Sequence, residues 1–152
     1  MSLTTLSGLI AILFYLISFV YQGKHLNMKA KEPNPGGWVF VLGLLAVLAH
    51  GVSAGGVLRN SEGYHFGIVQ ISTLICASIS LMVLLSSLRK PLGILVLGFF
   101  PLAIVSIIAS LTIESTYPPR ALAVGLASHI ILSILAYSLL TIAALQAGFL
   151  AF

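Results

Sequence analysis

Long apolar runs follow one another along the chain, and short polar segments separate them. Most of these runs are long enough for a helix to cross the ~30 Å hydrocarbon core of a bilayer. They lack the apolar–polar alternation of barrel strands, and in lipid only helices and closed barrels pair all backbone groups. The pattern therefore predicts an all-α polytopic transmembrane helix bundle of about five helices in a single domain. The expected spans are residues 3–22, 37–58, 65–88, 91–113 and 121–152.

The composition supports this class, because 59% of the 152 residues are hydrophobic and only 7% are charged. A soluble domain of this size needs a more charged surface. The first run has no basic segment before it and no small-residue cleavage site after it, so we interpret it as a retained helix and not as a signal peptide. The single cysteine, Cys76, lies in an apolar stretch and excludes a disulfide framework.

Basic residues gather in the first and third connections, which hold Lys24, Lys29, Lys31, Arg89 and Lys90, five of the seven Lys and Arg residues. By the positive-inside rule these connections are cytoplasmic and the N-terminus lies outside. The formal net charge of +4 is thus a topology signal, with contact to anionic lipid as a secondary consequence. Nucleic-acid binding is not expected.

Two histidines lie inside apolar spans, where titratable groups are costly and tend to mark functional sites. His50 comes about eight residues before the outer end of the second span, and His129 about nine residues after the outer start of the fifth. At the usual helical rise each is about 12–14 Å along its helix, so we expect the pair at matched depth on inward faces. Small residues share those faces at helical spacing: Gly43, Ala46, Ser53 and Ala54 with His50, and Gly125, Ser133 and Ala136 with His129.

This arrangement has two interpretations. In the structural one, each histidine hydrogen-bonds a hydroxyl or a carbonyl across a closely packed helix pair. In the functional one, the two imidazoles are axial ligands of one b-type haem, which needs neutral ring nitrogens and small residues where the porphyrin lies.

A resemblance is carried by Leu44–Gly51 and by Ser128–Ala144, whose His129, Ser133 and Tyr137 form a His-x3-Ser-x3-Tyr pattern. The second stretch resembles a helix of the cytochrome c assembly protein family, in its HemX-like branch of bacterial inner-membrane proteins. The resemblance implies a haem-handling protein of that membrane, tied to cytochrome c assembly or haem supply. It places haem b between His50 and His129, with Ser133 and Tyr137 as further cofactor-binding positions.

The chain also departs from this family. Members that deliver haem carry an external tryptophan-rich segment, whereas the only tryptophan here is Trp38 at the cytoplasmic end of the second span, where an interfacial anchor is expected. The resemblance therefore does not imply that this chain presents haem to an acceptor protein. The fifth run reaches Phe152 without a polar tail, so either the fifth helix runs unusually deep or the sequence is part of a longer chain. Because family members are longer, we expect it to be the N-terminal part of such a chain.

The other polar side chains leave alternatives open. His65, beside Tyr64 near the outer surface, is either a second haem contact or part of an interfacial aromatic belt. A polar trace on the third span either lines a cofactor cleft or joins helices; it consists of Gln70, Ser72, Thr73 and Ser78.

No nucleophile, paired carboxylate or phosphate loop is present, so an enzyme is not expected. Two alternatives to haem handling remain: a small transporter with histidine proton relays, and a non-catalytic accessory membrane subunit with packing histidines. The expected partners are the lipid bilayer and haem, and another membrane protein or a homo-oligomer stays open.

Overall fold

The structure, a computed structural model, describes residues 2–27, 37–60, 63–88, 93–113 and 118–151. Its helices are all long and apolar enough to cross a membrane. They are α1 (Leu3–Asn27), α2 (Gly37–Leu58), α3 (Ile68–Ser87), α4 (Gly93–Thr112) and α5 (Val124–Ala151), with two short strands, β1 (Arg59–Asn60) and β2 (Gly63–Tyr64), between α2 and α3. The predicted all-α membrane bundle is confirmed, and the chain is a multi-pass membrane protein.

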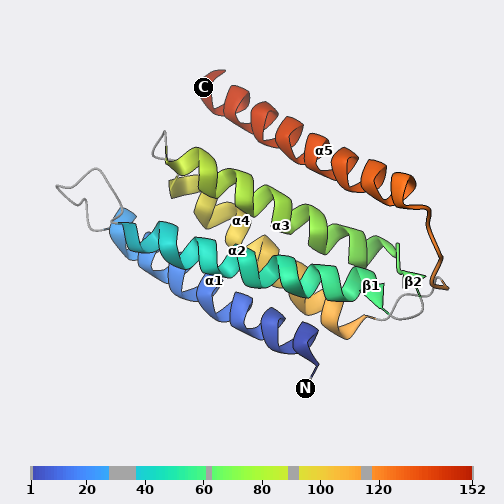
Figure 1. The fold of residues 1–152 in the computed structure, drawn as a ribbon. Coiled ribbons are helices and arrows are strands. Elements are labelled where there is room, and N and C mark those ends of the chain that lie inside the picture. Colours follow the sequence, from blue (N-terminus) through green and yellow to red (C-terminus); the bar gives the residue numbers. More distant parts are fainter. Residues whose placement is uncertain (1, 28–36, 61–62, 89–92, 114–117, 152) are drawn as a thin grey trace.

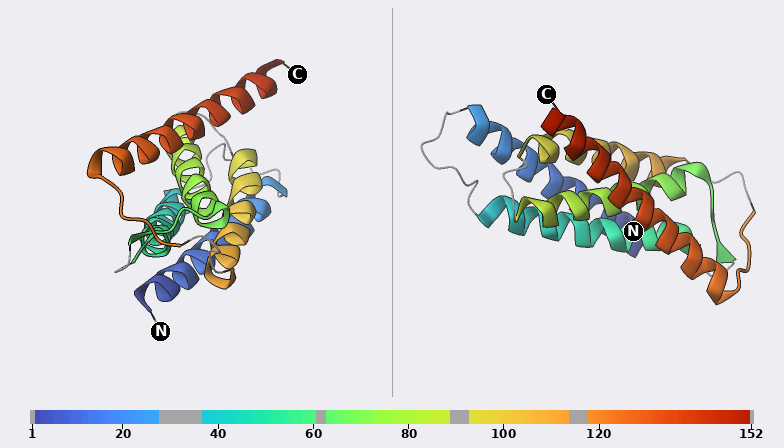
Figure 2. Two further views of the ribbon diagram at one scale, coloured as in Figure 1. Left: turned by 90° about the vertical axis from the view of Figure 1, so that its right-hand side faces the viewer. Right: turned by 90° about the horizontal axis from the view of Figure 1, so that it is seen from above.

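Helices α1 to α4 form a four-helix bundle, and α5 lies along one side of it (Figures 1 and 2). Within the bundle α1 packs on α2 and α4, and α3 packs on the same two helices. Helix α5 packs chiefly on α3. One broad face of α5 is therefore left without a helical neighbour among the described elements.

The strands and the segment that leads into α5 meet at one end of the bundle, here called the hairpin end. Strands β1 and β2 pair antiparallel, and the backbones of Tyr64 and Arg120 exchange two hydrogen bonds of 3.0 Å. Gly63 has a φ of 135°, and a Cβ added there would lie 2.9 Å from the Arg120 carbonyl oxygen, so this close approach requires glycine.

This pairing corrects two predicted boundaries. Helix α3 begins at Ile68 and not at residue 65, and α5 begins at Val124 and not at residue 121. In both cases residues near the boundary take part in strand pairing, which holds their backbone extended. Hydrophobicity alone does not show such a contact between distant segments.

At the opposite end, here called the basic end, α1 finishes and α2 starts. Helix α1 runs to Asn27, five residues past the predicted end, and carries Lys24 on its exposed surface. Trp38 is 68% exposed at the start of α2, as expected of an interfacial anchor. The remaining basic residues of this prediction lie outside the described residues, and they are Lys29, Lys31, Arg89 and Lys90.

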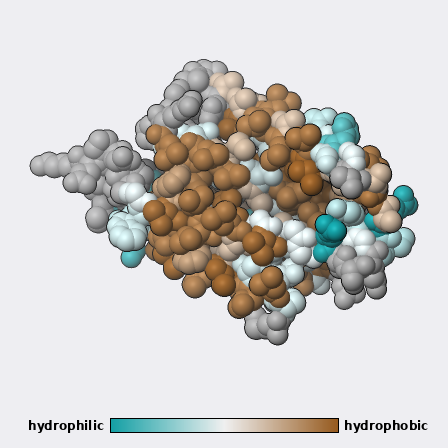
Figure 3. Space-filling view, viewed as in Figure 1, coloured by the Kyte–Doolittle hydropathy of each residue, from teal (hydrophilic) through white to brown (hydrophobic). Residues whose placement is uncertain are grey.

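The core of the bundle is aromatic and aliphatic, with Tyr15 and Phe100 fully buried at its centre. Gly43 allows close packing there, since a Cβ added to it would lie 2.8 Å from a methyl carbon of Leu84. The outer surface is apolar as well: Leu13 is 56% exposed and Val105 is 61% exposed. Hydrophobic residues cover much of the face shown in Figure 3, as expected of helices in contact with lipid.

Candidate functional site

His50 lies at the centre of the bundle, on the face of α2 that packs against its neighbours. Its side chain is 0% exposed. The residues that share its face are buried too, namely Gly43, Ala46, Ser53 and Ala54. The prediction that this small-residue face of α2 points inward is confirmed.

Both ring nitrogens of His50 are hydrogen-bonded to hydroxyl groups from other helices. Nδ1 lies 3.2 Å from the Tyr15 hydroxyl on α1, and Nε2 lies 2.9 Å from Oγ1 of Thr73 on α3. The Tyr15 ring meets the imidazole edge to face and packs in a similar way against Phe100 of α4, with centroids 4.8 Å apart. This Tyr15–His50–Thr73 network therefore joins α1, α2 and α3, and the aromatic contact adds α4.

The network satisfies a neutral imidazole completely. One ring nitrogen donates a hydrogen bond and the other accepts one, and a hydroxyl can act in either sense, so either tautomer fits. An axial haem ligand, in contrast, needs a ring nitrogen that is free to bind iron. In this arrangement neither nitrogen of His50 is free, because Tyr15 and Thr73 occupy them.

His129 has a different environment on α5. Its side chain is exposed, as are Gly125 and Ala136 of the same predicted face. The contact strip of α5 is instead formed by buried residues on nearly the opposite side of the helix from His129, namely Ala127, Ile134, Ser138 and Ile142. The prediction that the small-residue face of α5 points inward is therefore wrong for this structure, because α5 packs on α3 through another face.

The two other motif positions on α5 do not form a closed site around His129. The Ser133 hydroxyl donates a hydrogen bond of 2.8 Å to the His129 backbone carbonyl of the same helix. Tyr137 is 70% exposed. The structure thus places His129 and Tyr137 on an open helix surface, and it does not bring His129 together with His50, whose ring contacts α1 and α3.

His65 precedes α3 at the hairpin end. Its backbone N–H donates to the Leu58 carbonyl at 2.8 Å, and its buried Nε2 has no hydrogen-bond partner among the described residues. Aromatic contacts surround this segment: Tyr64 stacks on Phe66, and the Arg59 guanidinium lies 5.6 Å from the Tyr64 ring centroid. Both interpretations of His65 stay open.

Other polar side chains of α3 donate hydrogen bonds to backbone carbonyl oxygens. Gln70 donates from Nε2 to the Ile113 carbonyl at 3.2 Å, which ties α3 to the end of α4. Ser72 and Ser78 donate to carbonyls of their own helix. The Gln70 bond and the Thr73 bond to His50 fit the helix-joining interpretation of the polar trace, whereas the two serine bonds stay within α3.

The described residues hold no cluster of three or more His, Cys, Asp or Glu side chains that could bind a metal ion. The carboxylates Glu32, Glu62 and Glu114 lie outside the described residues.

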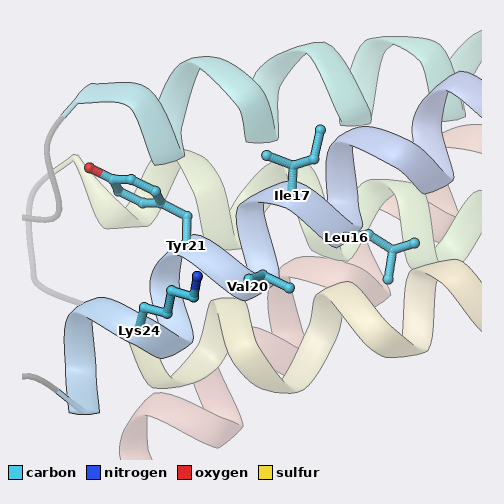
Figure 4. A pocket seen from close by; sticks show the side chains of 5 residues that line it. All are labelled: Leu16, Ile17, Val20, Tyr21 and Lys24. Carbon is cyan, nitrogen blue, oxygen red and sulfur yellow. The ribbon is translucent and has the colours of Figure 1, made fainter.

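A shallow groove of about 340 Å³ lies on the outer surface of α1 near the basic end (Figure 4). Leu16, Ile17 and Val20 form its apolar wall, and Tyr21 and Lys24 stand at its end. An apolar strip that ends in an aromatic and a cationic residue is typical of the boundary between acyl chains and head groups. The groove is thus best explained as a lipid-contact surface.

Comparisons with protein-family models, with curated proteins and with solved structures give no match to this chain. The relation to haem-handling proteins consequently stays a prediction from the residues of α2 and α5. Tyr15 was not singled out from the sequence, because a tyrosine in an apolar span gives no sign that its hydroxyl meets a histidine 35 positions away.

Proposed function

We propose that this chain is a haem-binding membrane protein of the bacterial inner membrane, with a role in cytochrome c assembly or haem supply. The observation that carries the proposal is His129, an imidazole exposed on a membrane-spanning helix. Exposure of such a group to hydrocarbon is unfavourable, and intramembrane titratable residues almost always face a partner, a cavity or a ligand. A haem bound through His129 would cover it. The exposed Tyr137, two turns further on, offers a hydroxyl to a propionate.

The second ligand in this proposal is His50, as the family resemblance implies. The hydrogen bonds in the structure set a condition on it, since iron binding at Nε2 requires loss of the Thr73 bond and binding at Nδ1 requires loss of the Tyr15 bond. A haem shared by both histidines also requires α5 to turn, because His129 lies on the exposed side of this helix and away from His50. His129 is therefore the ligand that the arrangement of the described residues favours most, and His50 is the conditional one.

A second candidate function is that of a non-catalytic accessory membrane subunit. It is favoured by the same network, because a fully buried histidine with both nitrogens hydrogen-bonded fits a packing role without any cofactor. In that case the open face of α5 with His129 is covered by another membrane protein or by a second copy of the chain.

Haem titration of the purified protein separates the two candidates. The variants are His129→Ala and His50→Ala, and Leu140→Ala is the control because it shortens another exposed side chain of α5, one that has no role in the proposed site. The haem proposal expects His129→Ala to lose most bound haem and Leu140→Ala to retain it. If His50 is the second ligand, His50→Ala changes a low-spin spectrum into a high-spin one. Haem uptake that is the same in wild type and His129→Ala would exclude His129 as the ligand.

A further inference from the structure

A buried polar stripe runs along the face of α1 that points into the bundle. It consists of Tyr15, Ser18 and Gln22, spaced by three and four residues, and none of them is more than 1% exposed. This spacing keeps the three side chains on one helix face. The stripe leads from the bundle centre, at His50, toward the basic end.

Three polar atoms along this half of the bundle lack hydrogen-bond partners among the described residues. They are Oγ of Ser18, Oε1 of Gln22 and Oγ of Ser80 on α3. An unpaired buried polar group of this kind is unfavourable, so native proteins nearly always pair it with protein or with ordered water.

Four other buried serines of the transmembrane helices, in contrast, have hydrogen-bond partners. Ser78, Ser106, Ser110 and Ser138 each donate to a carbonyl one turn earlier in their own helix, at 2.8 to 2.9 Å. That self-pairing is the usual solution for a serine in a membrane helix. Ser18 and Ser80 do not adopt it, although they are buried at least as deeply as these four serines.

These unpaired atoms continue the network around His50. Ser80 faces the Tyr15 hydroxyl, but not with the geometry of a hydrogen bond. Tyr15 in turn contacts Nδ1 of His50. Seven residues of helix separate Tyr15 from Gln22, which is about 10 Å, a length that about three hydrogen-bonded water molecules span.

We propose that a short chain of water molecules lies between Tyr15 and Gln22, and that it is a path for proton exchange between His50 and the basic end. Water bound there pairs Ser18, Ser80 and Gln22 at once, with the two or more polar partners that a buried water needs. An excess proton that enters the water chain as hydronium moves along it without any other reactant: the last hydronium gives its proton to the Tyr15 hydroxyl oxygen and becomes water, while the Tyr15 hydroxyl proton passes to the unprotonated Nδ1 of a neutral His50 whose Nε2–H donates to Thr73. The positive charge then rests on the imidazolium of His50. The reverse sequence returns the proton.

This inference does not rest on haem binding, and its test uses the protein in lipid bilayers without added haem. The measurement is water-edited solid-state NMR, which follows the transfer of magnetisation from mobile water to labelled side chains. Ser18 and Ser80 are expected to gain signal nearly as fast as the exposed Ser2, and several-fold faster than the self-paired Ser106 and Ser110. Transfer to Ser18 and Ser80 as slow as to Ser110 would overturn the proposal.

A pair of variants tests the connection to His50. Ser18→Val places methyl groups where water is proposed, and Ser106→Val makes the same change at a buried serine that is self-paired. We expect Ser18→Val to reduce water transfer to the labelled His50 ring several-fold, and Ser106→Val to leave it near the wild-type rate. Equal rates of water transfer to the His50 ring in the two variants would exclude this path. If a variant does not fold, the transfer rates of Ser18 and Ser80 in the wild type still decide whether water is present.

Discussion

Replacement of Thr73 by valine removes the hydroxyl that pairs Nε2 of His50 and keeps the shape of the side chain. Thr73 and His50 are both almost completely buried, so water cannot easily replace the hydroxyl that His50 loses. Hydrogen bonds between membrane helices contribute about 0.6 kcal/mol on average and up to about 1.7 kcal/mol. An unpaired buried nitrogen adds a desolvation penalty of about 1–3 kcal/mol in soluble proteins. We therefore expect Thr73→Val to lower the free energy of unfolding by about 1–2 kcal/mol, a factor of roughly five to thirty in the folded-to-unfolded ratio.

Reversible unfolding in mixed micelles, followed by circular dichroism during an SDS titration, measures this change. Thr73→Ser is the matched control because it retains Oγ and removes only the methyl group. We expect it to keep most of the stability that Thr73→Val loses. A loss in Thr73→Ser as large as that in Thr73→Val would show that packing of the methyl group, and not the bond to His50, stabilises this point, and an unchanged Thr73→Val would refute the reasoning altogether.

Two further predictions follow from the hairpin and from the charge distribution. Gly63→Ala introduces a Cβ at a φ of 135° and 2.9 Å from the Arg120 carbonyl oxygen. We therefore expect it to lower the free energy of unfolding by about 1–3 kcal/mol in the same titration. Gly55→Ala is the control, because a Cβ added there meets nothing within 4 Å, and we expect it to be neutral or slightly stabilising. If the basic end is cytoplasmic, a membrane-impermeant maleimide labels Arg59→Cys in intact cells and labels Lys24→Cys only after the cells are opened; the opposite pattern would reverse the proposed topology.

The five spans were predictable because length and hydropathy determine whether a helix can cross a bilayer. Their ends were less predictable. Helix α1 continues through Lys24, since a long cationic side chain can reach the interface from within a helix. The starts of α3 and α5 depend on the contact between Tyr64 and Arg120, which are far apart in the sequence.

The candidate site was predictable only in part, because helical periodicity shows which residues share a face but not what that face contacts. Periodicity places His50 on a small-residue face, and α2 buries that face as expected. The partner of that face was not predictable, because the same small residues allow either a porphyrin or the side chains of Tyr15 and Thr73 to approach. For His129 the orientation of α5 depends on which side of α3 it packs against, and the small residues along α5 do not determine that choice.

The central claim, that the chain binds haem through His129, is tested most directly by the visible absorption spectrum of the purified protein after incubation with haem, in the oxidised and the dithionite-reduced state. The account predicts a strong Soret band and reduced α and β bands in the wild type, and loss of most of this absorbance in His129→Ala. A wild-type protein that stays colourless, or a His129→Ala variant with the same spectrum, would contradict it.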